Sequence, residues 1–166
     1  MDAPITFDAA VEDFAIWSPT SDRIVFRSPR NGGPDLYLKA ADGTGADQLL
    51  VDSDRDKWPD DWSPDGRYLM YEEIAPNGKE DLWLVPMDGD RKPIVWIQSP
   101  FSESFPQFSP DGRWIAYESD ESGRYEVYVR PFTPPGTSAS NSVAAYQVSS
   151  GGGERPLSNN GGKELI

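Results

Sequence analysis

The feature that most constrains this 166-residue chain is a sequence pattern that occurs three times, at a spacing of about 45 residues. Each copy begins with an aromatic residue, at Trp17, Trp62 and Phe108. A Ser-Pro turn follows, and then a segment in which apolar and polar residues alternate: "RIVFRS", "RYLMYEE" and "RWIAYES". A fixed period in this range is typical of solenoids, propellers and arrays, in which each repeat buries its apolar faces against its neighbours.

The turn after the aromatic residue has a clear physical basis in two of the copies. It reads Ser63-Pro64-Asp65-Gly66 in the second and Ser109-Pro110-Asp111-Gly112 in the third. Proline presets φ, aspartate can accept hydrogen bonds from its own backbone, and glycine tolerates a positive φ. In the first copy Ser18-Pro19 is followed by Thr20-Ser21. We therefore expect that turn to differ in detail.

Each unit continues with a second turn, a further alternating segment and a short apolar segment, and no stretch shows helical periodicity. Four short antiparallel strands in each unit indicate a blade of a β-propeller. The sequence thus predicts an all-β fold with about three four-stranded blades and partial blades at both ends. The expected blades span residues 12–51, 58–97 and 104–149, with a partial unit at 154–166.

The partial units are assigned from short segments at each end. Ile5–Phe7 looks like the last strand of a preceding blade, and in the final unit Leu157 takes the aromatic position and Asn160-Gly161 the turn. The aromatic residues that open the three complete units are expected to be wedged between blades on the innermost strands. Their expected role, and that of the Ser-Pro turns, is structural.

Two of these segments, "WSPDGRYLMYEE" and "FSPDGRWIAYESDESGRYEVYVRPF", resemble the TolB-like propeller repeat. "KWPDDWSPDGRYLMYE" and "ESGRYEVYVRPF" are most similar to the propeller region that follows the kinase domain in bacterial eukaryotic-type Ser/Thr kinases. The resemblance implies a module outside the cytoplasm, periplasmic or extracytoplasmic, that binds partners or signals. Related propellers cap the active site of prolyl-oligopeptidase-type peptidases.

Composition narrows the possible partners. The formal net charge is −13, which disfavours nucleic acid and anionic membranes and favours a partner that is basic at its contact surface. No apolar run is long enough to insert in a membrane. The chain has no cysteine and no histidine, so thiol chemistry and histidine-dependent triads are excluded. Exposed blade faces could also lead to self-association.

The acidic stretch after the first unit invites comparison with a calcium loop. Asp52, Asp54 and Asp56 have the D-x-D-x-D spacing, but Lys57 stands where an EF-hand needs glycine and Ser63 where it needs glutamate. We therefore expect a solvated acidic loop, with no metal ligands and no cofactor site.

The adjacent carboxylates Asp60 and Asp61 precede the inner aromatic residue and could suggest a propeller glycosidase. The other units lack equivalent acids, and the sequence carries no kinase, nucleotide-loop or nucleophile-elbow signature. We therefore expect a non-catalytic module for protein or ligand interaction, part of a larger envelope or sensor protein. The contact surface is expected in the loops Asp52–Asp61 and Ser99–Gln107. The alternative is a propeller glycosidase or an accessory propeller domain of a prolyl-oligopeptidase-type peptidase.

Overall fold

The computed structural model describes residues 6, 8–136, 144–157 and 165. Twelve strands lie in this part of the chain, in three sheets of four. The first sheet contains β1 (Asp13–Trp17), β2 (Arg23–Ser28), β3 (Asp35–Ala40) and β4 (Gln48–Val51). The second contains β5 (Lys57–Trp62), β6 (Tyr68–Ile74), β7 (Glu80–Pro86) and β8 (Ile94–Ile97). The third contains β9 (Glu103–Phe108), β10 (Trp114–Ser119), β11 (Glu126–Pro131) and β12 (Tyr146–Gln147).

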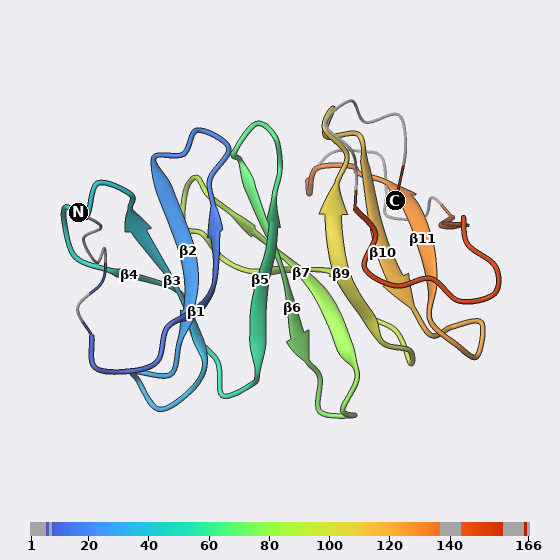
Figure 1. The fold of residues 1–166 in the computed structure, drawn as a ribbon, viewed down its shortest axis with the longest axis horizontal. Helices are drawn as coiled ribbons and strands as arrows, with labels where there is room; N and C mark the ends of the chain where they lie inside the picture. The colour runs from blue at the N-terminus through green and yellow to red at the C-terminus, as the bar shows by residue number, and fades with distance from the viewer. Residues whose placement is uncertain (1–5, 7, 137–143, 158–164, 166) are drawn as a thin grey trace.

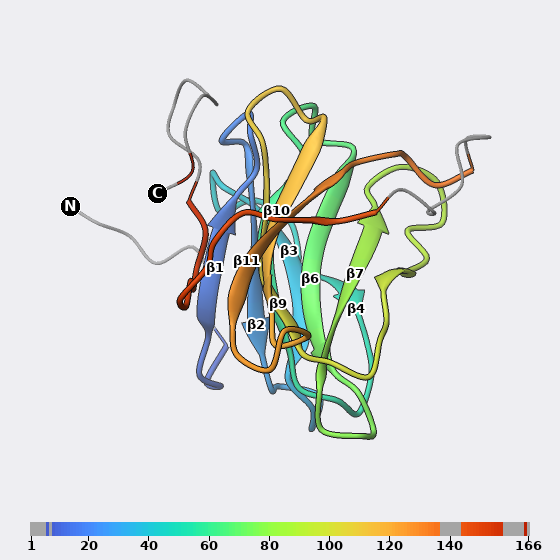
Figure 2. The same cartoon turned by 90° about the vertical axis from the view of Figure 1, so that its right-hand side faces the viewer.

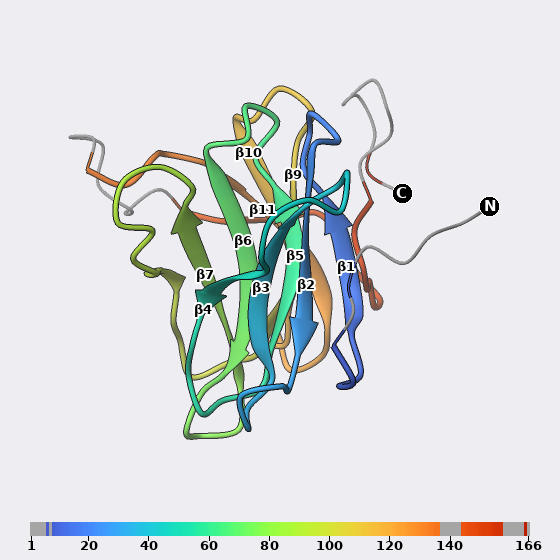
Figure 3. The same ribbon diagram turned by 90° about the vertical axis from the view of Figure 1, so that its left-hand side faces the viewer.

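The three sheets stand side by side as propeller blades (Figure 1). Each is an antiparallel meander, and the first strands of neighbouring sheets contact one another, β1 with β5 and β5 with β9. These inner strands lie on one side of the molecule, whereas β4 and β7 lie on the other (Figures 2 and 3). In the described residues no helix is long and apolar enough to cross a membrane. The all-β blade architecture predicted from the repeat is confirmed.

The Ser-Pro turns have one geometry in all three units. The amide of the fourth turn residue donates to the carbonyl of the first, from Ser21 to Ser18, Gly66 to Ser63 and Gly112 to Ser109, at 2.8 Å each. Ser21 has φ +57°, beside +71° and +68° for the two glycines. The backbone of the Thr20-Ser21 turn thus matches the other two turns, and the expected difference in detail is confined to its side-chain hydrogen bonds.

The first turn keeps its shape because other hydrogen bonds replace those of the missing aspartate. In the second unit the Ser63 hydroxyl donates to Asp65 and accepts the amide of Tyr68, at 2.6 and 2.9 Å. In the first unit the Ser18 hydroxyl donates instead to Asp22 and accepts the amide of Arg23, at 2.8 and 3.0 Å. Arg23 thus corresponds to Tyr68. The sequence alignment, which pairs Arg23 with the arginines after the other two turns, Arg67 and Arg113, is wrong by one residue.

Apolar side chains from facing sheets form the core between blades. Trp62, Leu69 and Tyr71 of the second sheet pack on Val25 and Leu38 of the first. The same arrangement recurs at the next junction, where Phe108, Ile115 and Tyr117 pack on the second sheet. Trp62 and Phe108 are each only 4% exposed, so both lie between blades.

Trp17 differs from these two residues, because it is 56% exposed. It lies on the face of the first sheet that points away from the second, where no described sheet covers it. The inter-blade packing expected for Trp17 is therefore not found. Arg30 covers other aromatic residues on this face, with its guanidinium 5.4 Å from the Phe26 ring centre and 4.4 Å from that of Tyr37. Arg30 also pairs with Glu12 and Asp47.

Two expectations fall partly outside the described residues. The strand expected at Ile5–Phe7 is described only at Thr6, and the turn expected at Asn160-Gly161 is not described. Leu157, expected in the aromatic position of the final unit, is exposed.

Candidate interaction surface and blade junctions

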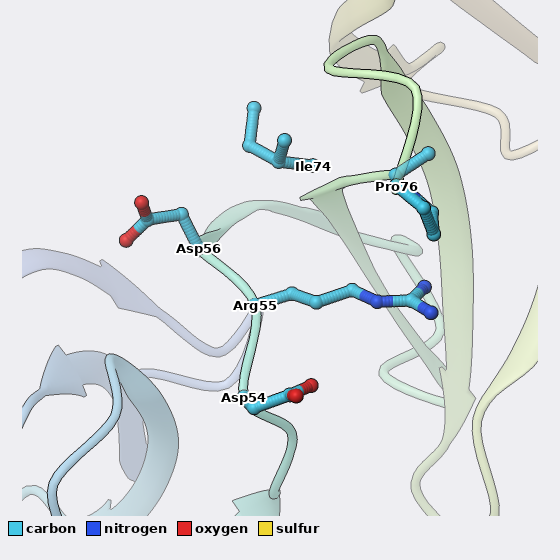
Figure 4. A pocket seen from close by; sticks show the side chains of 6 residues that line it. Asp54, Arg55, Asp56, Ile74 and Pro76 are labelled. Atoms are coloured by element: carbon cyan, nitrogen blue, oxygen red, sulfur yellow. The ribbon is translucent and has the colours of Figure 1, made fainter.

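The acidic loop between the first and second blades is solvated. Asp52, Asp54 and Asp56 are exposed, and the loop lies beside the β6–β7 hairpin (Figure 4). Together with Ile74, Ala75 and Pro76 the segment Asp54–Asp56 lines an open depression of about 260 Å³. The depression therefore has the carboxylates and the Arg55 side chain on one wall and apolar atoms on the other.

Ion pairs to both neighbouring sheets hold this loop in place. Arg55 extends toward the hairpin (Figure 4) and pairs with Glu73 at 3.2 Å, while Asp56 pairs with Arg27 of the first sheet, also at 3.2 Å. Within the described part of the chain, the carboxylates of Asp52 and Asp54 have no ion-pair or hydrogen-bond partner. In the same residues there is no cluster of three or more acidic, histidine or cysteine side chains able to hold a metal ion.

The counterpart segment Ser99–Gln107 is mostly buried, contrary to the expectation of a continuous contact loop. Only Pro100 and Phe101 are exposed, whereas Ser102–Ser104 are buried. The reason is that β9 begins at Glu103 and enters the blade junction directly. A contact surface on this side of the molecule is therefore confined to the short turn before β9.

The acids Asp60 and Asp61 also lie inside the blade junction, not on an exposed loop. The carboxylate of Asp61 accepts the amide of Trp62 at 2.8 Å and the amide of Phe108, in the next blade, at 2.7 Å. Burial raises the pKa of Asp61 to about 6, and these two donors oppose the shift. With both oxygen atoms engaged, Asp61 joins two blades.

Glu72 makes a second link between the same two blades. Its Oε2 atom accepts the amide of Phe105 at 3.1 Å. Burial raises the pKa of Glu72 to about 7, and burial followed by the charge of Glu72 raises that of neighbouring Asp60. The Oδ2 atom of Asp60 is buried without a hydrogen-bond partner in the described structure. These carboxyl groups therefore favour protonated forms at higher pH than exposed acids do.

A buried ion pair connects the first and second blades. Lys57, at 0% exposure, contacts Asp35, at 2%, with 3.4 Å between Nζ and Oδ1. The ammonium also donates to the carbonyls of Pro34 and Ser53, at 3.2 and 3.0 Å. All three ammonium protons thus have acceptors, which offsets the cost of burying the charge.

The junction between the second and third blades lacks this ion pair. Asp81 and Glu103 occupy it, at 1% and 3% exposure, and each has a buried oxygen atom without a partner in the described structure. Gln98 donates to the other oxygen of Asp81 at 2.8 Å, and Ser99 to the other oxygen of Glu103 at 2.6 Å. Burial, with the charge of Asp81 adding to it, raises the pKa of Glu103 to about 7.

Comparison with solved structures identifies the architecture. The structure assigned as TolB from Agrobacterium tumefaciens matches with a TM-score of 0.70 and 20% identity, over 84% of this chain and 47% of that chain. TolB from Acinetobacter baumannii matches with a TM-score of 0.74 and 18% identity, over 97% of this chain and 38% of that one. The fold is that of a TolB-like β-propeller. This chain spans less than half the length of either TolB structure.

More distant propellers share the architecture. A prolyl endopeptidase matches with a TM-score of 0.57 and 13% identity, over 84% of this chain and 22% of that chain. No family model matches the sequence, and neither does any curated protein. At these identities the comparisons establish the TolB-like fold alone.

Proposed function

We propose that this chain is a non-catalytic TolB-like propeller module that binds a protein or peptide with a basic contact surface. The observation that carries the proposal is the loop at Asp52–Asp56. It presents the unpaired carboxylates of Asp52 and Asp54 beside an apolar-walled depression, on a backbone fixed by ion pairs to two blades. Loops held by a rigid scaffold are common binding surfaces. A lysine or arginine could contact the carboxylates while an apolar side chain fills the depression.

The same proposal includes the kind of larger protein that contains the module and the compartment in which it acts. The repeat sequence resembles the propellers of bacterial eukaryotic-type Ser/Thr kinases, and the fold resembles TolB. Both support a role as the interaction part of a larger envelope or sensor protein, located in the periplasm or otherwise outside the cytoplasm. The net charge of −13 is consistent with electrostatic steering of a basic partner.

A defined peptide pair tests the contact. Fluorescence anisotropy would compare a labelled peptide of alternating lysine and glycine with one central phenylalanine against the same peptide with glutamate for lysine. We expect only the basic peptide to bind, and its binding to weaken as salt rises from about 20 to 150 mM. The double variant Asp52→Asn/Asp54→Asn should weaken it several-fold.

The control variant Asp88→Asn/Asp90→Asn removes the same charge from a different exposed loop, between β7 and β8. Equal losses for the two double variants would contradict the assigned surface, and equal binding of both peptides would contradict a basic partner. Hydrolysis of a glycoside or peptide by the purified chain, abolished by changing Asp60 or Asp61 to asparagine, would overturn the non-catalytic assignment.

A further inference from the structure

The three blades place an acidic residue at the same register position. Asp35, Asp81 and Glu126 each begin the third strand of a blade or lie next to its start, where they pair with Ser28, Glu73 and Ser119. Lys57 and Glu103 likewise hold equivalent positions on β5 and β9, because they pair with Glu73 and Ser119. The repeat therefore allows three chemically different versions of one junction to be compared within a single chain.

Two of the three acids are fully neutralised or hydrogen-bonded. Asp35 faces the ammonium of Lys57. Glu126 accepts the amides of Gly151 and Gly152, both at 2.9 Å, the Ser149 hydroxyl at 2.5 Å and the Arg124 guanidinium at 2.7 Å. These donors hold the pKa of Glu126 at about 2, the Ser149 hydroxyl contributing most. Each acid thus has cationic or hydrogen-bonding partners supplied by the chain itself.

Asp81 differs from both, because Gln98 donates to its Oδ2 atom but the position of its cationic partner is taken by another acid, Glu103. The charges that act most on Glu103 are those of Asp81, Glu121 and Asp120, all negative. The Oδ1 atom of Asp81 and the Oε2 atom of Glu103 are buried without partners in the described structure. Two buried carboxyl groups with free oxygen atoms are costly unless a cation or a proton lies between them.

We propose that a calcium ion binds between Asp81 and Glu103, where the first junction holds the ammonium of Lys57. The carbonyls of Pro34 and Ser53, which accept from that ammonium, correspond by register to those of Glu80 and Ser99. With these carbonyls as further ligands, the proposed site would combine two carboxylates with neutral oxygen atoms, the all-oxygen type of set that calcium prefers. Gln98 and Pro100, in the turn that precedes β9, are exposed, so the site lies close to the surface of the molecule.

The donor set also indicates the strength of binding. Two carboxylates are fewer than in high-affinity calcium loops, so we expect a Kd on the order of 10⁻⁴ M, close to that of extracellular calcium modules. This site is distinct from the exposed loop at Asp52–Asp56. It joins the second and third blades, so binding should stabilise the folded chain.

Thermal unfolding followed by circular dichroism tests the site. The wild-type chain at about pH 8 should gain roughly 5–11 °C in Tm in about 10 mM CaCl₂, relative to NaCl of equal ionic strength. Glu103→Gln and Asp81→Asn should each abolish most of this gain. The Asp54→Asn variant, which alters the exposed acidic loop, should retain it.

The most informative variant is Glu103→Lys, which recreates the junction of Lys57 with Asp35. It should raise Tm in the absence of calcium and remove the response to calcium. An unchanged wild-type Tm in calcium would overturn the proposal. A rise in Tm as pH falls from about 8 to 6 that Glu103→Gln removes would instead assign the position to a shared proton. A calcium response that persists in Glu103→Lys would place the ion elsewhere and also overturn it. MgCl₂ at the same concentration should give a smaller gain, since Mg²⁺ demands stricter geometry and dehydrates reluctantly.

Discussion

Replacing Lys57 by methionine should destabilise the fold far more than removing a charge from the surface of the molecule. Methionine retains most of the side-chain volume and removes only the ammonium. Asp35 would then remain at 2% exposure with no cation beside it, and the carbonyls of Pro34 and Ser53 would lose a donor. Breaking a buried ion pair in this way costs about 3–5 kcal/mol. For a chain of this length, that corresponds to a fall in Tm of roughly 6–20 °C.

The measurement is urea or thermal unfolding of four proteins: wild type, Lys57→Met, Asp35→Leu and the double variant. Removing both charges leaves no unpaired charge, so the double variant should be more stable than Lys57→Met. Lys79→Met is the matched control. The pair of Lys79 with Asp120 is close, at 2.6 Å, but partly exposed, and should contribute less than about 1 kcal/mol. A decrease in Tm of less than about 2 °C for Lys57→Met would refute this reasoning, and so would equal decreases for Lys57→Met and Lys79→Met.

Three further outcomes are expected. Ser21→Gly should raise stability by about 0.5–1 kcal/mol and Gly112→Ser lower it similarly, because both positions have positive φ; equal and opposite shifts in Tm would verify this. Burial raises the pKa of Glu72 to about 7, so the folded state retains a proton that the unfolded chain loses near pH 4.5. This stabilisation is present below about pH 4.5 and is lost toward pH 7, so Tm should fall from about pH 5 to 8. Glu72→Gln should make that fall smaller without abolishing it, because burial also raises the pKa of Asp61 and Glu103. Arg30→Ala uncovers Tyr37 on the outer face of the first sheet, so light scattering should show increased self-association.

Local signals in the sequence are sufficient to predict the blades. Turn chemistry and period-two alternation act within a few residues, so they indicate strands and turns without knowledge of packing. A local error remains at Arg23, which is aligned one residue out of register because the first turn lacks the Asp-Gly pair that marks the position in the other units. Ser21 takes the left-handed conformation while Ser18 and Asp22 supply the contacts that aspartate and glycine supply elsewhere.

The blade junctions cannot be predicted in the same way, because their partners are far apart in the sequence. Lys57 meets Asp35 only when two sheets stack, and Asp61 reaches the amide of Phe108 in the next blade. The sequence suggests a contact loop for Asp61 because this residue precedes Trp62 near a turn. The sequence does contain one signal that the two junctions differ. Lysine at position 57 is replaced by glutamate at the equivalent position 103 of the next repeat.

A hydrogen bond between the second strand of one blade and the segment that begins the next unit recurs along the chain. Glu72 accepts the amide of Phe105, and the register-equivalent Glu118 accepts the amide of Arg155 at 2.9 Å. At the first junction the corresponding residue is Pro59, which has no amide hydrogen to donate.

An acid at the equivalent position of the first blade would therefore have no partner, and the residue there is Arg27. Its guanidinium lies 5.1 Å from the Trp58 ring centre and pairs with Asp56 of the acidic loop. The exchange of an acid for a base thus accompanies the exchange of an N–H donor for a proline. The same exchange also fixes one side of the loop that carries Asp52 and Asp54. The departure from the repeat at the first junction thus positions the surface that we propose for binding.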